Sequence, residues 1–251
     1  MENGSLYTSI QDGIASIEFY HSASNSFPSN LLERLSKAFK DLSENDEVQV
    51  IILKSEKEKA FCAGASFNEL IAISNETQGA EFFMGFANVI NAMRSCSKLI
   101  IGRIQGKAVG GGVGLAAACD YCFATEAASI KLSELTIGIG PFVIAPAVTR
   151  KMGTAAFSEL AMDATHWQNA YWAQKKGLYT HVYENIKEMD SALKNFSEKI
   201  ASYNPASLTQ LKAVFWEGTE HWETLLKERA LISGKLVLSD FTKQALQQFK
   251  K

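Results

Sequence analysis

The sequence predicts an α/β fold built around a largely parallel sheet. Over residues 1–150, apolar runs with the β-branched content of strands alternate with segments whose apolar residues recur at helical spacing. Two of the strand-like runs are followed by glycine-bearing loops. From about residue 143 onward, strand-like runs become rare and apolar residues recur mostly at helical spacing. Such alternation places consecutive strands side by side in one direction, with helices as the crossovers.

Length, charge, apolar runs and cysteine content limit the classes of protein to which this chain can belong. The chain has 251 residues, of which 47% are hydrophobic, and this suffices for a sizeable core. With a net charge of -2, the chain lacks the excess of positive charge that is typical of nucleic-acid-binding proteins. The apolar runs are too short to cross a bilayer, and residues 1–13 lack the pattern of a secretory signal. Four cysteines fit a reducing compartment, so we expect a cytoplasmic protein with neither a nucleic-acid nor a membrane partner.

The first expected element is a β-hairpin. Residues 6–10 and 14–19 are rich in strand-forming side chains, and Asp12 and Gly13 lie between them. An Asp-Gly pair between two such runs is typical of a hairpin turn, because both residues tolerate positive φ.

The remaining elements follow from apolar spacing and β-branched content. They are a helix over 30–42, a strand over 48–53, a mostly helical stretch over 68–95, a strand over 99–104, a small-residue helix over 111–119, and short strands over 121–125 and 129–132. Residues 155–251 read as helical, with loops near 203–206 and 233–234.

Two loops of small residues are candidates for stabilising a negatively charged oxygen. Residues 63–65 follow the strand expected at 48–53, and the glycines 110–112 follow the strand expected at 99–104. Small side chains let a carbonyl oxygen approach backbone N–H groups, and the helix that begins near Gly111 adds free N–H groups at its start. The alternative is that these glycines serve only tight turns and close helix packing.

Glu134 is an acid in an otherwise apolar stretch that includes Leu132, Leu135 and Ile137. Burial among such residues would raise the pKa of the carboxyl group, which suits a group that both gives and takes a proton. The alternative is a solvated charge on a loop.

Three motifs resemble those of the enoyl-CoA hydratase/isomerase, or crotonase, superfamily. They are FCAGASFNEL at 61–70, GKAVGGGVGLAAACD at 106–120 and LSELTIGIGP at 132–141. The resemblance extends over nearly the whole chain. It implies a crotonase-like spiral of ββα units over residues 1–190 and a C-terminal helical trimerisation region over 191–251.

The resemblance also implies the chemistry of the site. The substrate is a coenzyme A thioester, and neither a metal nor a cofactor beyond that coenzyme is implied. By position in the motifs, the amides of Ala65 and Gly111 bind an oxyanion, and Glu134 is the catalytic acid/base. The further residues expected to contact substrate are Ala63, Ser66, Phe67, Gly110, Pro141 and Phe142. The usual assembly is a homotrimer or a hexamer made of two trimers.

The chain departs from the family pattern at Gly114, where hydratases with two catalytic glutamates carry the second one. A side chain one helical turn after Gly111 would face the same cavity, so we expect open space there. The GGGVGL variant resembles 3-methylglutaconyl-CoA hydratases of leucine degradation. The preferred function is hydration of an α,β-enoyl-CoA by a single glutamate. The alternatives are an enoyl-CoA isomerase and a non-catalytic acyl-CoA-binding protein.

Other patterns have competing interpretations. Residues 112–117 match a dinucleotide-binding G-x-G-x-x-A pattern, but no second long strand follows. Cys119 and Cys122 have C-x-x-C spacing, and we interpret them as core residues because a structural zinc site needs four ligands.

The aromatic stretch 82–86 is either core or the border of an acyl pocket. A lysine of the tail 249–251 either approaches a neighbouring subunit's coenzyme phosphates or is simply solvated.

Overall fold

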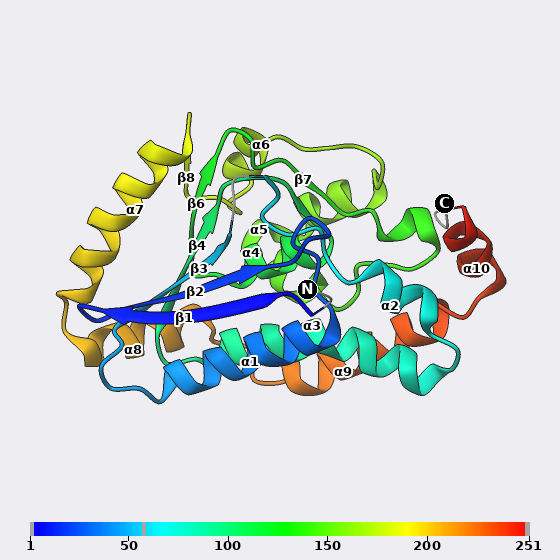
Figure 1. Ribbon diagram of the computed structural model, residues 1–251, viewed down its shortest axis with the longest axis horizontal. Coiled ribbons are helices and arrows are strands. Elements are labelled where there is room, and N and C mark those ends of the chain that lie inside the picture. The colour runs from blue at the N-terminus through cyan, green and yellow to red at the C-terminus, as the bar shows by residue number, and fades with distance from the viewer. Residues whose placement is uncertain (1–2, 57–58, 249–251) are drawn as a thin grey trace.

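The computed structural model describes residues 3–56 and 59–248 and confirms the α/β class (Figure 1). Its main sheet has six strands in the order β1-β2-β3-β4-β6-β8. These are β1 (Ser5–Gln11), β2 (Ile14–Tyr20), β3 (Val50–Ser55), β4 (Leu99–Ile104), β6 (Tyr121–Thr125) and β8 (His181–Tyr183). Only β1 and β2 are antiparallel to each other, and the other neighbours in this sheet are parallel.

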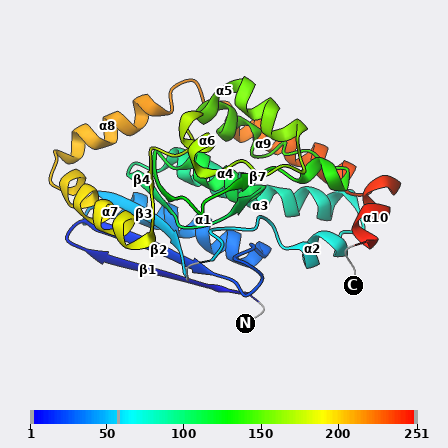
Figure 2. The same cartoon turned by 90° about the horizontal axis from the view of Figure 1, so that it is seen from above.

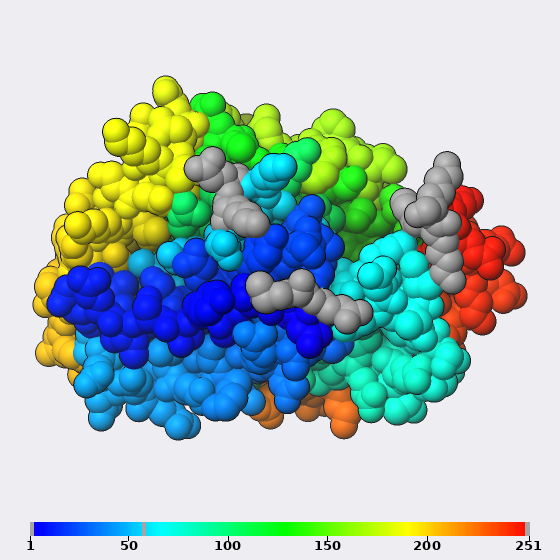
Figure 3. Space-filling model, viewed as in Figure 1, coloured from blue at the N-terminus to red at the C-terminus, as the bar shows by residue number. Residues whose placement is uncertain are grey.

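The predicted hairpin is confirmed. Gln11 pairs with Ile14, and the two residues between them, Asp12 and Gly13, have φ values of 50° and 78°. The turn therefore uses the left-handed conformation that matches the twist of the flanking strands. The hairpin lies along one face of the molecule, next to α1 (Ser29–Ser43) (Figure 3).

A second, small sheet gives the fold its spiral. It contains the parallel strands β5 (Ala108–Val109) and β7 (Ile130–Lys131). Isolated bridges extend it on both sides, namely Phe27 with Ala65, Cys62 with Ala108, and Ile130 with Gln168. Each parallel strand from β2 to β6 is thus followed by a short stretch in the small sheet and then by a helix. This confirms the expected winding of ββα units.

Both faces of the main sheet are buried at strands β3 and β4, whereas most of β1 is exposed. Ile51, Leu53 and Ile100 point into the main core, which includes residues of α1, α3 (Glu76–Ser95), α4 (Gly111–Ala118) and α5 (Ala145–Met162). Their sequence neighbours Ile52 and Ile101 point the other way, toward α7 (Ile186–Ala201) and α8 (Pro205–Phe215). Figure 2 shows strands β3 and β4 between α7 and the pair α3 and α4. A sheet covered on both faces explains the nearly continuous apolar runs of β3 and β4.

The remaining helices are α2 (Phe67–Ala72), the 3₁₀ turn η1 (Glu134–Ile137), α6 (Ala170–Lys175), α9 (Trp222–Leu236) and α10 (Asp240–Gln247). Two helices, α2 and α3, replace the single stretch expected over 68–95. The loop expected near 233–234 is wrong, because α9 continues through it. Gly234 packs against α3 there, and a Cβ on Gly79 would lie 2.6 Å from the Gly234 carbonyl oxygen.

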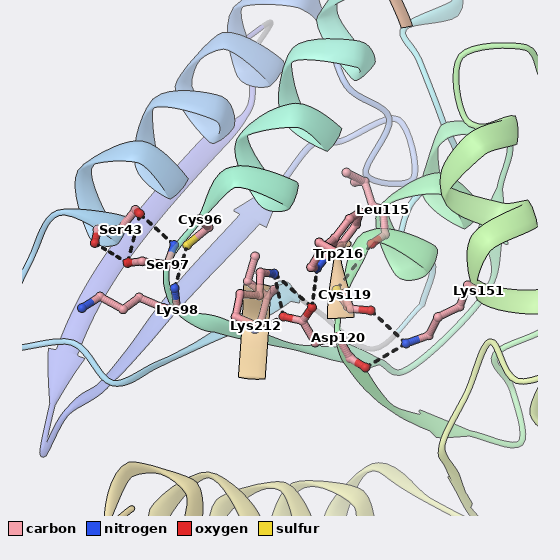
Figure 4. A network of polar contacts seen from close by, with 11 residues as sticks. Ser43, Cys96, Ser97, Lys98, Leu115, Cys119, Asp120, Lys151, Lys212 and Trp216 are labelled. Atoms are coloured by element: carbon pink, nitrogen blue, oxygen red, sulfur yellow. Dashed lines mark hydrogen bonds and ion pairs between the residues drawn. The ribbon is translucent and has the colours of Figure 1, made fainter. Parts of the chain in front are cut away.

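A buried polar network fixes α8 to the spiral (Figure 4). Lys212 of α8 donates hydrogen bonds of 2.7 and 3.0 Å to the two carboxylate oxygens of Asp120. Trp216 and the backbone N–H of Ile100 also donate to Asp120, at 2.8 and 2.7 Å. Lys212 and Asp120 are each almost fully buried. Asp120 lies just before β6 and also binds the Ile100 amide of β4, so this buried and weakly screened charge pair holds α8 to both strands.

Across the described residues, no helix is both long and apolar enough to traverse a bilayer.

Candidate active site

A cavity of about 520 Å³ is formed where the small sheet, α3 and η1 meet. Both glycine loops contribute to its wall, at residues 63–65 and 109–111. Much of the remaining wall is apolar and includes Phe82, Phe83 and Phe86 of α3. The cavity therefore combines exposed backbone with an apolar surface, as is usual for small-molecule sites.

The two predicted oxyanion donors lie in adjacent stretches of this wall. The Val109 amide donates a 2.9 Å hydrogen bond to the carbonyl oxygen of Cys62, which aligns the two loops. A Cβ on Gly64, whose φ is 89°, would lie 3.6 Å from the Gly111 nitrogen. Within the described part of the chain, the amides of Ala65 and Gly111 donate no hydrogen bond. Both are thus free to bind a ligand oxygen, and the positive end of α4 favours negative charge at Gly111.

Glu134 lies against the second of these loops. A Cβ on Gly110 would stand 2.8 Å from Oε1 of Glu134 and 3.4 Å from its Cδ. Gly110 has φ 53° and ψ -117°, a conformation that side-chain-bearing residues rarely adopt. A glycine is therefore required at 110 both by the backbone and by the carboxyl group that it contacts.

The carboxyl group of Glu134 is desolvated. Its Oε2 atom is buried and has no hydrogen-bond partner among the described residues. Burial raises the pKa of this carboxyl to about 7, and a hydrogen bond from its own backbone N–H offsets part of the rise. Of the apolar neighbours expected from the sequence, Leu132 is buried and Ile137 lines the cavity, whereas Leu135 is 47% exposed. The prediction of a raised pKa is confirmed.

The open space expected at Gly114 does not exist. A Cβ on Gly114 would lie 2.8 Å from the Cβ of Ile144 and closer still to its Cγ2 methyl group. Gly114 is absent from the cavity wall, whereas Ile144 is part of it. The space that a second glutamate would enter is therefore filled by an apolar side chain. Close packing against Ile144 explains why residue 114 is a glycine.

Five of the six predicted substrate-contacting residues line the cavity, namely Ala63, Phe67, Gly110, Pro141 and Phe142. Ser66 does not. Its hydroxyl caps α2 and accepts a 3.4 Å hydrogen bond from the backbone N–H of Glu69. The substrate contact of Ser66 therefore stays a prediction, and the role that the structure shows for its hydroxyl is the cap of α2.

The cavity residues that sequence reasoning missed include Lys131, Ile144 and Ser233. Lys131 was detectable, because it alternates with the buried Ile130 in a predicted strand and must face the other way. Ser233 comes from α9, and nothing in its local sequence indicates a contact with residues 63–144. The aromatic stretch 82–86 does border the cavity.

The competing interpretations find no geometric support. All four cysteines are free and buried, as expected for core residues. The strand before Glu134 has only the two residues of β7, which is too short for a dinucleotide-binding unit. Within residues 3–56 and 59–248, no group of three or more His, Cys, Asp or Glu side chains is placed to hold a metal ion. The tail 249–251 lies outside the described residues.

Comparisons with known proteins agree with this geometry. A family model described as enoyl-CoA hydratase/isomerase matches residues 9–250. The peroxisomal Delta(3,5)-Delta(2,4)-dienoyl-CoA isomerase of Arabidopsis thaliana is 30% identical over 199 residues, covering 73% of this chain and 70% of that protein. The mitochondrial methylglutaconyl-CoA hydratase of Rattus norvegicus is 32% identical over 200 residues, covering 78% and 63%. The crystal structure of enoyl-CoA hydratase from Bacillus halodurans superposes with a TM-score of 0.90 at 19% identity, covering 97% and 99%, which shows a shared fold.

Proposed function

The chain belongs to the enoyl-CoA hydratase/isomerase family, and on that premise we propose that it hydrates an α,β-unsaturated acyl-CoA thioester with Glu134 as its one acid/base. One observation carries the proposal. A desolvated carboxyl group with a pKa of about 7 lines the same cavity as two adjacent backbone amides that have no hydrogen-bond partner among the described residues. Such amides stabilise an enolate, and such a carboxyl exchanges protons near neutral pH.

The first half of the reaction uses Glu134 as a base. Its carboxylate takes a proton from water while the water oxygen forms a bond to the β-carbon. The electrons of the double bond then move toward the thioester oxygen. The amides of Ala65 and Gly111 donate hydrogen bonds to the resulting enolate oxygen, an effect for which each donor commonly contributes about 2.7–4 kcal/mol.

The second half returns the proton. Glu134, now protonated, donates it to the α-carbon, and the thioester carbonyl re-forms. Water has then been added across the double bond, and the carboxylate is restored. A single carboxyl group suffices because it holds the proton only between the two steps.

A second candidate is isomerisation of an enoyl-CoA, and the packing at Gly114 favours it. Ile144 fills the space that a second acid would use to hold water. Among the described residues, Glu134 supplies the one carboxyl group of the cavity wall. A lone base in an apolar cavity is suited to moving a proton from the α-carbon to the γ-carbon, which needs no bound water.

Ultraviolet absorbance separates these reactions. Loss of the conjugated band from an α,β-enoyl-CoA indicates hydration, and gain of that band from a β,γ-enoyl-CoA indicates isomerisation. A panel of thioesters followed by mass spectrometry, with 3-methylglutaconyl-CoA included, defines the acyl group. Neither change with any thioester, together with tight binding, would point to thioester hydrolysis or to binding without catalysis, and mass spectrometry distinguishes these two.

We also propose that the chain assembles into a trimer or a pair of trimers. Support comes from apolar side chains on the C-terminal helices that are 41–56% exposed, namely Leu211, Val214 and Phe215 of α8 and Leu231 and Ile232 of α9. Clustered exposed apolar residues mark interaction surfaces. Light scattering coupled to size-exclusion chromatography tests the assembly, and a monomeric mass would contradict it.

A further inference from the structure

Two lysine side chains lie against one tryptophan, and one of these lysines belongs to the cavity wall. The Nζ atoms of Lys107 and Lys131 lie 4.8 and 4.7 Å from the ring centroid of Trp167. Lys131 is half-buried and also forms part of the cavity wall. We name these three residues the lysine–tryptophan cluster.

The small sheet explains why the cluster faces the ligand. Lys131 pairs with Val109, and the bridge between Ile130 and Gln168 places Lys131 opposite Trp167. Side chains alternate along a strand, and Ile130 is fully buried in the core, so Lys131 points away from the core. Val109 also lines the cavity, which identifies this as the ligand-facing side of the sheet.

Residues 3–56 and 59–248 supply no negatively charged partner to the two lysines. Among the described residues, neither Lys107 nor Lys131 forms an ion pair. Glu134 is the one carboxyl group of the described cavity wall, and its burial favours the uncharged form. Each ammonium group lies over the Trp167 ring, and cation–π attraction to the ring stabilises both side chains in these positions. An anion bound at Lys131 would supply the opposite charge and gain charge-assisted hydrogen bonds.

We propose that the lysine–tryptophan cluster is an anion-binding subsite in which Lys131 binds a carboxylate or phosphate group of the thioester ligand. The inference rests on the proposed function, because it places the thioester oxygen of the same ligand at the amides of Ala65 and Gly111. Two sources can supply the anion: a carboxylate at the far end of the acyl group, or a phosphate of the coenzyme.

Four saturated probes separate the sources. Butanoyl-CoA and succinyl-CoA have acyl groups of the same length, and only the second ends in a carboxylate. The corresponding pantetheine esters lack the coenzyme phosphates. Calorimetric titration gives the Kd of each probe for the wild type and for the variants Lys131→Met and Lys131→Arg. The matched control is Lys187→Met, which changes an exposed lysine of α7.

If the subsite binds an anion, Lys131→Met should raise the Kd of the anionic probes by about tenfold or more, because a hydrogen bond to a charged group is lost. Lys131→Arg and Lys187→Met should bind them nearly as the wild type does. A loss for both CoA esters and for neither pantetheine ester assigns the phosphate. A loss for the two succinyl esters alone assigns the acyl carboxylate.

Other results overturn the subsite. Unchanged affinity for all probes in Lys131→Met would show that no anion binds there. An equal loss for uncharged butanoyl-pantetheine would show that Lys131 merely supports the cavity wall. In both cases binding of butanoyl-CoA by the wild type leaves the proposed function standing. A wild type that binds none of the four probes would contradict the proposed function and the subsite together.

Discussion

The carboxyl group of Glu134 lies directly against Gly110 in the cavity wall, with its Oε1 atom 2.8 Å from the point where a Cβ would stand on the glycine. The glycine thus sets how closely the carboxyl group approaches the loop that carries the Gly111 amide. This relationship joins the two halves of the proposed chemistry, the oxyanion donors and the proton carrier. It also makes the site testable one residue at a time.

Glu134→Gln should lower turnover of the substrate at least about a hundredfold, because the amide cannot take or return a proton. Binding of a saturated acyl-CoA should change little, since the shape of the side chain is kept. Steady-state kinetics and calorimetric titration measure the two effects. Turnover close to that of the wild type would remove Glu134 from the mechanism.

The raised pKa of Glu134 predicts a dependence of stability on pH. The native carboxyl has a pKa of about 7 and its ordinary value is 4.5, so the native state binds more protons than the unfolded state between these values. The free energy of unfolding should therefore fall as pH rises from about 4.5 to 7, by at most about 3 kcal/mol from this group. Glu134→Gln should remove this contribution. Urea denaturation at several pH values measures it, and a stability difference between the two proteins that does not vary with pH would contradict it.

Gly110→Ala should reduce activity strongly, because the new methyl group displaces the Glu134 carboxyl and the backbone is strained. Gly218→Ala is the matched control. Gly218 also has a positive φ, 77°, but a Cβ there meets nothing within 4 Å. Both variants should lose about 1–2 kcal/mol of stability from backbone strain, and only Gly110→Ala should lose activity. Equal activities in the two variants would rule out the role of the Gly110 contact.

Gly114→Glu alone should destabilise the protein and lower activity, because Ile144 occupies the space that the new side chain needs. Combining it with Ile144→Ala should recover part of both losses. A double-mutant cycle on stability and kcat measures the coupling, which for residues in contact is about 0.5–3 kcal/mol. Strictly additive effects would mean that the two positions do not compete for space.

Lys212→Met should lower the free energy of unfolding by about 3–5 kcal/mol, because it leaves the buried Asp120 carboxylate without its charged partner. The control is Lys37→Met, which breaks an equally short but exposed pair with Asp41 and should cost less than about 1 kcal/mol. Denaturant unfolding compares them. Similar losses in the two variants would show that the network of Figure 4 does not anchor α8.

Local patterns were sufficient for much of the fold. Asp12 and Gly13 tolerate positive φ, so the hairpin could be predicted from two residues. The strand at 99–104 and the small-residue helix after Gly110 were predicted within a residue or two, because burial on both faces and small side chains leave clear composition signals. Strand β8 was not predicted, because three residues are too few to show the alternation of a strand. Only its pairing with β6 in the structure identifies it as a strand.

The sequence by itself determined the family, the spiral fold and the identity of the catalytic candidates, because motifs such as Phe61-Cys-Ala-Gly-Ala carry that information in consecutive residues. Only the tertiary structure decided what surrounds them. Ile144 fills the space beside Gly114, and the Ser66 hydroxyl caps α2. Lys131, which lines the cavity, lies beside Trp167. The physical reason is that packing and charge pairing join residues far apart in the chain, and no local pattern records which distant side chain will occupy a given volume.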